Sequence, residues 1–152
     1  MSHVDLSHIR AVLFDLDGTL LQVEMAEFIP RYIAGLSERF SDLISPNKFK
    51  KNLLNGIREL ILGETNGATN EERLFAVMQK DLSISAQDFR LRLDLFRDQG
   101  VDVLADMVTA IPDAITAVEH CRLQNQKLVL ATNPVFPMFM IDARRRWSGL
   151  SD

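Results

Sequence analysis

One stretch of sequence decides the fold. It starts with an apolar run typical of a strand and ends with residues typical of a turn: Ala11-Val12-Leu13-Phe14-Asp15-Leu16-Asp17-Gly18-Thr19-Leu20. Its first half is short and rich in aliphatic residues, and it predicts a buried strand over residues 9–16. Gly18 permits a tight turn, and Thr19 can hold that turn through its hydroxyl. Asp15 is therefore expected at the carboxyl end of a strand, where open α/β sheets place their ligand crevices.

Two carboxylates, Asp15 and Asp17, stand at the end of this predicted strand. A carboxylate can act as a nucleophile in phosphoryl transfer and form an aspartyl-phosphate. It can also ligate Mg²⁺, a hard cation that prefers carboxylates and substrate phosphates. The structural alternative is a polar turn in which the aspartates cap backbone amides. The apolar run before the pair and the Thr19-Leu20 sequence after it favour the functional interpretation.

Residues 22–110 read as a helical block. Apolar residues recur at helical spacing from Glu24 to Phe40. Three further helices have typical start signals, which are Ser45-Pro46, Thr69 with Glu72, and Ser85 with Asp88.

Helix and strand patterns alternate after this block. Residues 113–124 predict a helix, residues 127–132 predict a second buried strand, and residues 137–147 predict a helix closed by Gly149. The order is strand, helical insertion, helix, strand, helix. It predicts an α/β sheet interrupted by a helical domain.

Size and charge narrow the class of protein. The chain has 152 residues, which suits one domain or a small core with an insertion. Its net charge of −4 argues against a nucleic-acid partner and against an anionic membrane surface. No apolar run approaches the roughly 20 residues of a membrane span. Cys121, the single cysteine, fits a reducing compartment. We expect a soluble, cytoplasmic protein.

Two motifs carry a resemblance to a known family. Residues 15–20 resemble the first motif of the haloacid dehalogenase-like (HAD) hydrolases, and residues 128–133 resemble the second, a strand that ends in Ser or Thr. The block between them resembles the cap that this family inserts after its first motif. The resemblance implies a Rossmann-like core with an incomplete parallel sheet, formed by residues 1–21 and 111–152, and an α-helical cap over residues 22–110.

The resemblance also implies a reaction, the Mg²⁺-dependent hydrolysis of a small phosphate ester through an aspartyl-phosphate. Asp15 would be the nucleophile and a Mg²⁺ ligand. Asp17 would protonate the leaving group, later activate water, and ligate the metal through its backbone carbonyl. Thr132 would hold the phosphoryl group by its hydroxyl, helped by the amide of Asn133. A carboxylate at Asp17 favours ester hydrolysis over halide displacement, because an alkoxide leaving group benefits from general acid catalysis.

Two later motifs of the family, a lysine and a group of metal-binding aspartates, cannot be placed in this sequence. Lys127 precedes the second motif, and Asp152 is terminal and follows no strand. Loss of one transition-state donor typically reduces the rate by about 10²–10³. We therefore interpret the chain as the N-terminal portion of a longer enzyme or as a truncated product, and expect a large deficit in activity.

Two other functions stay open. One is a non-catalytic remnant that binds a phosphate ligand or a protein partner through an exposed sheet edge. The other is a fragment that works only with its missing C-terminal half. The strand bearing Asp15 would have an open, hydrophobic edge, which is prone to association. The two intact carboxylates favour the enzyme.

Two further features each have a structural and a functional interpretation. The run Arg144-Arg145-Arg146 is interpreted as a solvated helix face near a helix C-terminus, where positive charge suits the helix dipole. The alternative is that it binds the substrate phosphate. Phe136 follows the second motif and is interpreted as a residue of the core or of the cap interface, with substrate contact as the alternative.

Overall fold

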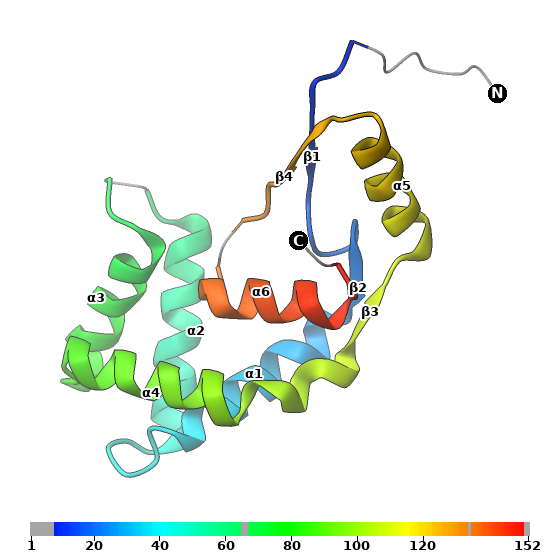
Figure 1. Cartoon of the computed structure of the whole chain (residues 1–152). Coiled ribbons are helices and arrows are strands. Elements are labelled where there is room, and N and C mark those ends of the chain that lie inside the picture. The colour runs from blue at the N-terminus through cyan, green and yellow to red at the C-terminus, as the bar shows by residue number, and fades with distance from the viewer. Residues whose placement is uncertain (1–7, 65–66, 134, 151–152) are drawn as a thin grey trace. The chain divides into compact units, whose positions relative to one another are not determined.

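The structure is a computed structural model that describes residues 8–64, 67–133 and 135–150. Figure 1 shows the order of the elements along the chain. The helices are α1 (Met25–Glu38), α2 (Pro46–Leu62), α3 (Asn70–Leu82), α4 (Ala86–Gln99), α5 (Pro112–Leu123) and α6 (Met138–Trp147), with a 3₁₀ helix over Val101–Met107. The strands are β1 (Ala11–Phe14), β2 (Leu21–Val23), β3 (Val108–Ala110) and β4 (Lys127–Leu130).

The described residues group into two compact units. The sheet unit contains the residues up to Val23, the segment Val108–Asn133, and the residues from Arg144 onward. The helical unit contains Glu24–Met107 and the segment that ends at Ala143. The predicted division into a core (1–21 and 111–152) and a cap (22–110) stays a prediction. The residues of α6 up to Ala143, which that division assigns to the core, group with the helical unit in the structure.

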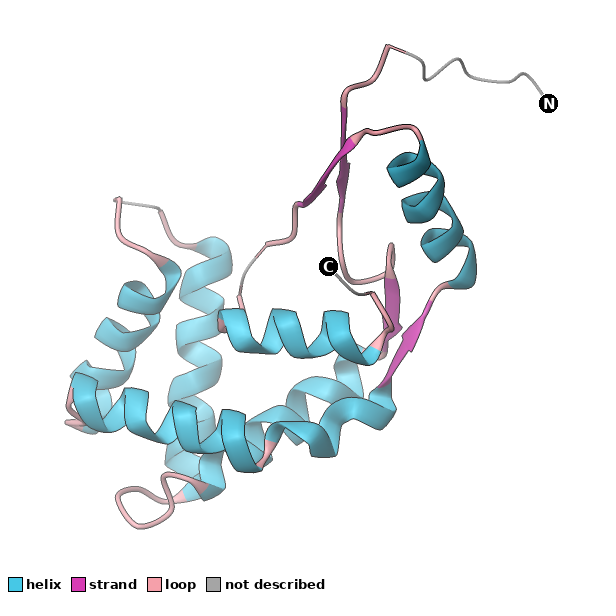
Figure 2. Cartoon of the chain, viewed as in Figure 1, coloured by secondary structure: helices cyan, strands magenta, loops and turns pink. Residues whose placement is uncertain are grey.

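The sheet unit contains two small sheets. β1 and β4 are two of the strands drawn in Figure 2, and they pair in parallel. Their register runs from Ala11 opposite Lys127 to Phe14 opposite Leu130. β2 and β3 pair as an antiparallel ribbon. The parallel pair is the incomplete sheet that the sequence predicts, and the mixture of helices and strands confirms the α/β class.

The two parallel strands are more exposed than the sequence suggests. Leu13 of β1 is 64% exposed, and Val129 and Leu130 of β4 are 36% and 38% exposed. The prediction that these strands are buried is therefore wrong for this chain. Aliphatic strands lose their exposure only when strands and helices cover both faces, and β1 has β4 as its partner in the described sheet.

The antiparallel ribbon was not predicted. Its strands have three residues each, too few to show a period of two, and they lie at the limits of the predicted helical block. Leu21 is fully buried and Val108 is 5% exposed, so the ribbon is held by apolar contact as well as by its ladder. Ile111 extends the ladder, since its amide donates to the carbonyl of Leu20 at 3.2 Å.

The helical unit begins its helices where the sequence predicts. Thr69 and Glu72 form a reciprocal capping box at the start of α3, and the hydroxyl of Ser85 accepts from the amide of Asp88 at the start of α4. Ser45 precedes α2 without a side-chain capping bond, so that start depends on Pro46 at the first helical position. None of the described helices combines the length and the apolar character that crossing a membrane requires.

Aromatic rings form the interior of the helical unit. Phe40 and Phe49 stack with their ring centroids 4.5 Å apart. Phe136 packs edge-on against Tyr32 and Phe28, with centroid distances of 5.3 and 5.9 Å. Since Phe136 is only 7% exposed, the interpretation of this residue as part of a core is confirmed.

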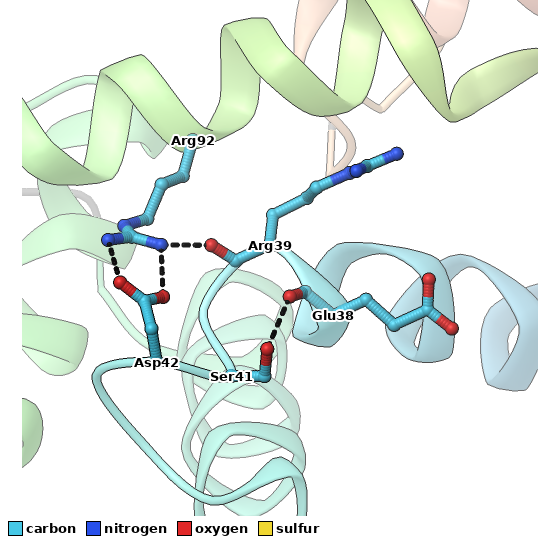
Figure 3. A network of polar contacts seen from close by, with 5 residues as sticks. All are labelled: Glu38, Arg39, Ser41, Asp42 and Arg92. Carbon is cyan, nitrogen blue, oxygen red and sulfur yellow. Dashed lines mark hydrogen bonds and ion pairs between the residues drawn. The ribbon is translucent and has the colours of Figure 1, made fainter.

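A polar network fastens α4 to the loop after α1 (Figure 3). Arg92 donates to both carboxylate oxygens of Asp42, at 2.6 and 2.8 Å, and to the carbonyl of Arg39. The hydroxyl of Ser41 donates to the carbonyl of Glu38 at 2.8 Å. The Arg92 hydrogen bond lowers the pKa of the Asp42 carboxyl. The network satisfies two carbonyls at the end of α1, which a helix C-terminus otherwise leaves to solvent.

Candidate active site

The register of β1 and β4 brings the predicted site residues to one edge of the sheet. Asp15 directly follows Phe14, the last residue of β1, and Phe14 lies opposite Leu130, the last residue of β4. The ladder continues one step further, since the amide of Ala131 donates to the carbonyl of Phe14 at 2.7 Å. Thr132 comes next along the chain. The carboxyl ends of two neighbouring parallel strands thus present Asp15 and Thr132 together, as at the ligand-binding edge of open α/β sheets.

These residues are accessible from solvent. Asp15 and Asn133 are exposed, and Thr132 is half-buried. All three belong to the sheet unit. The hydroxyl of Thr132 and the main-chain amide of Asn133, which follow the end of the neighbouring strand, are donors that can receive an anionic group, because hydrogen bonds to an anion offset part of its charge.

The turn after β1 is closely defined by hydrogen bonds. The carbonyl of Leu16 accepts from the amides of Leu20 and Leu21, at 2.9 and 3.2 Å, and the amide of Gly18 donates to Leu21 at 2.8 Å. Gly18 has a φ of 79°, a left-handed conformation that side chains rarely adopt. Because Leu16, Leu20 and Leu21 are buried, the turn is anchored in the interior and presents Asp17 beyond the strand.

The structure adds a residue that the sequence interpretation missed. Nη1 of Arg144 donates to both carboxylate oxygens of Asp17, at 2.5 and 2.6 Å. The Arg144 side chain is 2% exposed and that of Asp17 is 29% exposed. Arg146 is exposed as predicted, but the interpretation of Arg144 as part of a solvated face is wrong.

A signal for the burial of Arg144 was present in the helical spacing. Arg144 lies four residues after Met140 and three after Ile141, so these residues share one face of α6. Met140 is fully buried and Ile141 is 4% exposed. An arginine in line with such an apolar stripe is expected to be buried with a counter-charge.

Main-chain hydrogen bonds close α6 shortly after Arg144. The amide of Leu150 donates to the carbonyl of Arg145 at 3.2 Å, and the amide of Gly149 donates to that of Arg146 at 3.0 Å. Gly149 has a φ of 77°. This pair of bonds with a left-handed glycine is a Schellman motif, and it confirms that Gly149 closes the helix.

The residues present supply part of a Mg²⁺ site. The carboxylate of Asp15 and the main-chain carbonyl of Asp17 are hard oxygen donors of the kind that Mg²⁺ prefers, and the turn's hydrogen bonds are accepted by Leu16 and Leu21 rather than by that carbonyl. Mg²⁺ in proteins commonly keeps several waters and binds one or two carboxylates, so the chemical type of these two donors is suitable for Mg²⁺. Among the described residues, no three His, Cys, Asp or Glu side chains cluster to hold a metal. Asp152 lies outside them.

Comparison with known proteins identifies the family. A family model described as haloacid dehalogenase-like hydrolase matches residues 9–152. The chain therefore belongs to the haloacid dehalogenase-like hydrolases. No curated protein and no solved structure gives a significant match.

Proposed function

We propose that this chain carries the phosphoryl-transfer site of a Mg²⁺-dependent phosphate-ester hydrolase. The observation that supports the proposal most strongly is the parallel register of β1 and β4, which presents Asp15 and Thr132 at one edge of the sheet. Asp17 follows on an anchored turn. The substrate class is a small phosphate ester, because an alkoxide leaving group is the kind that needs a proton donor such as Asp17.

In the first step, an Oδ atom of Asp15 attacks phosphorus. The bond between phosphorus and the ester oxygen breaks, and Asp17 gives its proton to the departing alkoxide. The hydroxyl of Thr132 and the main-chain amide of Asn133 donate to the phosphoryl oxygens, where charge develops in the transition state. The product of this step is an aspartyl-phosphate on Asp15 and a free alcohol.

In the second step, water attacks the phosphorus of the aspartyl-phosphate. Asp17, now a carboxylate, takes a proton from that water, and the bond between Asp15 and phosphorus breaks to release inorganic phosphate. Mg²⁺ bound by the Asp15 carboxylate and the Asp17 carbonyl would supply positive charge against the dianionic phosphate. Asp15 and Asp17 return to their starting states, so the cycle balances.

The test is phosphate release from p-nitrophenyl phosphate in Mg²⁺ by the whole chain. We expect slow release that Asp15→Asn and removal of Mg²⁺ by a chelator both abolish. Thr132→Ala should reduce the rate about 10²-fold, since it removes one transition-state donor. Asp113→Asn, which changes an exposed carboxylate on α5, is the matched control and should leave the rate unchanged.

A second measurement detects the covalent step. Acid quenching of the wild-type chain with radiolabelled substrate should leave phosphate bound to protein, and Asp15→Asn should lose that label. Phosphate release that survives Asp15→Asn would contradict the assignment of the nucleophile.

A second candidate function is association with another polypeptide through the edge of the β1–β4 sheet. It is favoured by the exposure of Leu13 and Leu130, since an apolar strand with an open edge can accept a further strand. Sedimentation velocity over a range of concentrations, with Leu13→Lys for comparison, tests this proposal. Association that the charged variant weakens would support it, and a monomer at all concentrations would count against association between copies of this chain.

A further inference from the structure

An apolar pocket lies inside the helical unit, between three of its helices and the segment that leads into α6. Its volume is about 200 Å³. Leu60 of α2, Leu74 of α3 and Leu93 of α4 line it, and residues 135–138 complete the lining. Every described residue of the lining belongs to the helical unit. The pocket is therefore a property of that unit alone.

Two aromatic rings of the lining are held by contacts outside the pocket. Phe89 is 2% exposed and packs against Phe40 and Phe75, with centroid distances of 5.7 and 5.9 Å. Phe136 is held in the same way by its edge-on contact with Tyr32. A ligand that enters such a pocket meets walls that are already ordered, so binding costs little conformational entropy of the protein.

Loose packing of the helices does not account for the pocket. α2 and α3 lie so close at Gly56 that a methyl group there would overlap Cδ1 of Leu74. Arg73 of α3 fastens the end of α2, since it donates to the carbonyls of Glu59 and Gly63 at 2.6 and 3.2 Å. Protein interiors are close-packed, with few voids larger than a water molecule. A hollow beside such close contacts is therefore part of the shape of the unit.

The polar side chains of the lining already have partners. The Glu71 carboxylate accepts from Nε of Arg90 at 3.0 Å, and its side chain is 58% exposed, so its charge is both paired and hydrated. Oδ1 of Asn70 accepts from Nη1 of Arg73 at 3.3 Å. The other described residues of the lining are apolar. Apolar walls give a charged ligand nothing in exchange for its lost hydration, so the pocket favours an uncharged one.

The volume selects a ligand with a single ring. An apolar cavity of about 150 Å³ accommodates benzene, so this pocket suits one aromatic ring with a short substituent. The rings of Phe89 and Phe136 in the lining are suitable partners for edge-to-face contact with such a ring. Met138 also belongs to the lining and is 67% exposed, and its flexible thioether can adapt to an aromatic ligand.

We infer that the helical unit binds a small uncharged aromatic molecule in this pocket. The inference goes beyond the proposed function, because the pocket shares no described residue with the phosphoryl-transfer site. The probe 4-fluorobenzyl alcohol represents this class of ligand, since it has one ring, one hydroxyl and no charge.

Fluorine NMR of the probe in the presence of the whole chain measures binding. We expect a dissociation constant of about 1 mM or lower, as is ordinary for so small a ligand. The charged analogue 4-fluorobenzoate should bind at least about 10-fold more weakly, because its carboxylate would lose hydration. The ε-methyl signal of Met138, identified by its loss in Met138→Leu, should shift during the titration and so locate the ligand.

Variants of α4 test the pocket directly. Leu93→Trp places a larger side chain in the lining and should weaken binding of the probe at least about 10-fold. Leu91→Trp is the matched control, because Leu91 is 57% exposed on the same helix and is not part of the lining, and it should leave the affinity unchanged. Leu93→Ala enlarges the pocket and should shift the preference toward the fluorinated naphthalene analogue of the probe.

Each contrary outcome has a definite meaning. No binding of the alcohol, or binding that Leu93→Trp leaves unchanged without a shift at Met138, would overturn the inference. Equal or tighter binding of 4-fluorobenzoate would overturn the assignment of an uncharged ligand. Circular dichroism checks that each variant folds, and if Leu93→Trp does not, the Met138 shift in the wild-type chain and the selectivity of Leu93→Ala decide. All of these measurements record binding and not turnover, so their failure is distinct from failure of the proposed function.

Discussion

A double-mutant cycle between Arg144 and Asp17 measures their contact independently of any activity. The variants are Arg144→Met, Asp17→Asn and the combination of both. Methionine keeps much of the length and the apolar stem of arginine, and asparagine keeps the shape of aspartate. The cycle therefore removes the charges while it changes the packing little, which is the condition for interpreting a coupling energy.

The expected magnitude follows from the exposure of the two side chains. Exposed ion pairs have coupling energies of about 0.2–1 kcal/mol, while breaking a buried pair destabilises by about 3–5 kcal/mol. Arg144 is 2% exposed and Asp17 is 29% exposed, which places the pair between these limits and nearer to the buried case. We expect a coupling free energy of about 1–3 kcal/mol.

Trp147 makes the measurement specific. It is the single tryptophan of the chain and lies three residues after Arg144 on α6. Its fluorescence during urea unfolding therefore reports the segment that carries the contact. A parallel cycle with Arg146→Met and Asp17→Asn is the control and should show no coupling. A coupling energy within about 0.3 kcal/mol of zero for Arg144 and Asp17 would refute the reasoning, because independent sites add to within that range.

Three further predictions concern the helical unit. Phe40→Ala should lower the free energy of unfolding by about 3–5 kcal/mol in urea titrations followed by circular dichroism, since the ring is fully buried and stacks on Phe49; a loss below about 1 kcal/mol would contradict this packing. Thr69→Ala should destabilise by about 1 kcal/mol in the same assay, because it removes the capping box of α3, and an unchanged stability would argue against that cap. Arg92 lowers the folded-state pKa of Asp42, so this pair adds stability above the unfolded-state pKa of about 3.9 and loses it as the pH falls through the folded value. The free energy of unfolding of Asp42→Asn should accordingly fall less than that of wild type during acid titration. Identical pH profiles of the two proteins would contradict a stabilising contribution of the Arg92–Asp42 pair.

Much of the helical unit could be predicted because its signals are local. The capping box of Thr69 and the proline at Pro46 act within one turn of the helix that they start. Gly149 ends α6 through hydrogen bonds to residues in the preceding turn. Such contacts depend on residues three to five positions apart, so a single sequence contains both partners within one short window.

The placement of the candidate site was predictable for a similar reason. An apolar strand that ends in Asp15, and another that ends shortly before Thr132, need only to pair in parallel for both residues to reach one edge. The family resemblance supplied that pairing. The roles of Asp15, Asp17, Thr132 and Asn133 stay predictions, which the activity assays will test.

The parts that could not be predicted depend on distant partners. β2 and β3 have three residues each, and each becomes a strand only because the other lies beside it. The exposure of β1 depends on how many strands and helices cover it. The aliphatic residues of β1 cannot indicate that number.

By itself, the sequence determined the positions of most helices, the carboxylates at the end of β1, and the family to which the chain belongs, because these depend on short-range patterns and on motif spacing. The spacing of Arg144 from Met140 and Ile141 signals the buried side of α6, but tertiary structure alone decided that Asp17 is the partner of Arg144. Arg144 and the exposed Arg146 have the same chemistry and the same helix. They differ in which side of α6 faces the interior, and a partner 127 residues away in the chain makes that burial favourable.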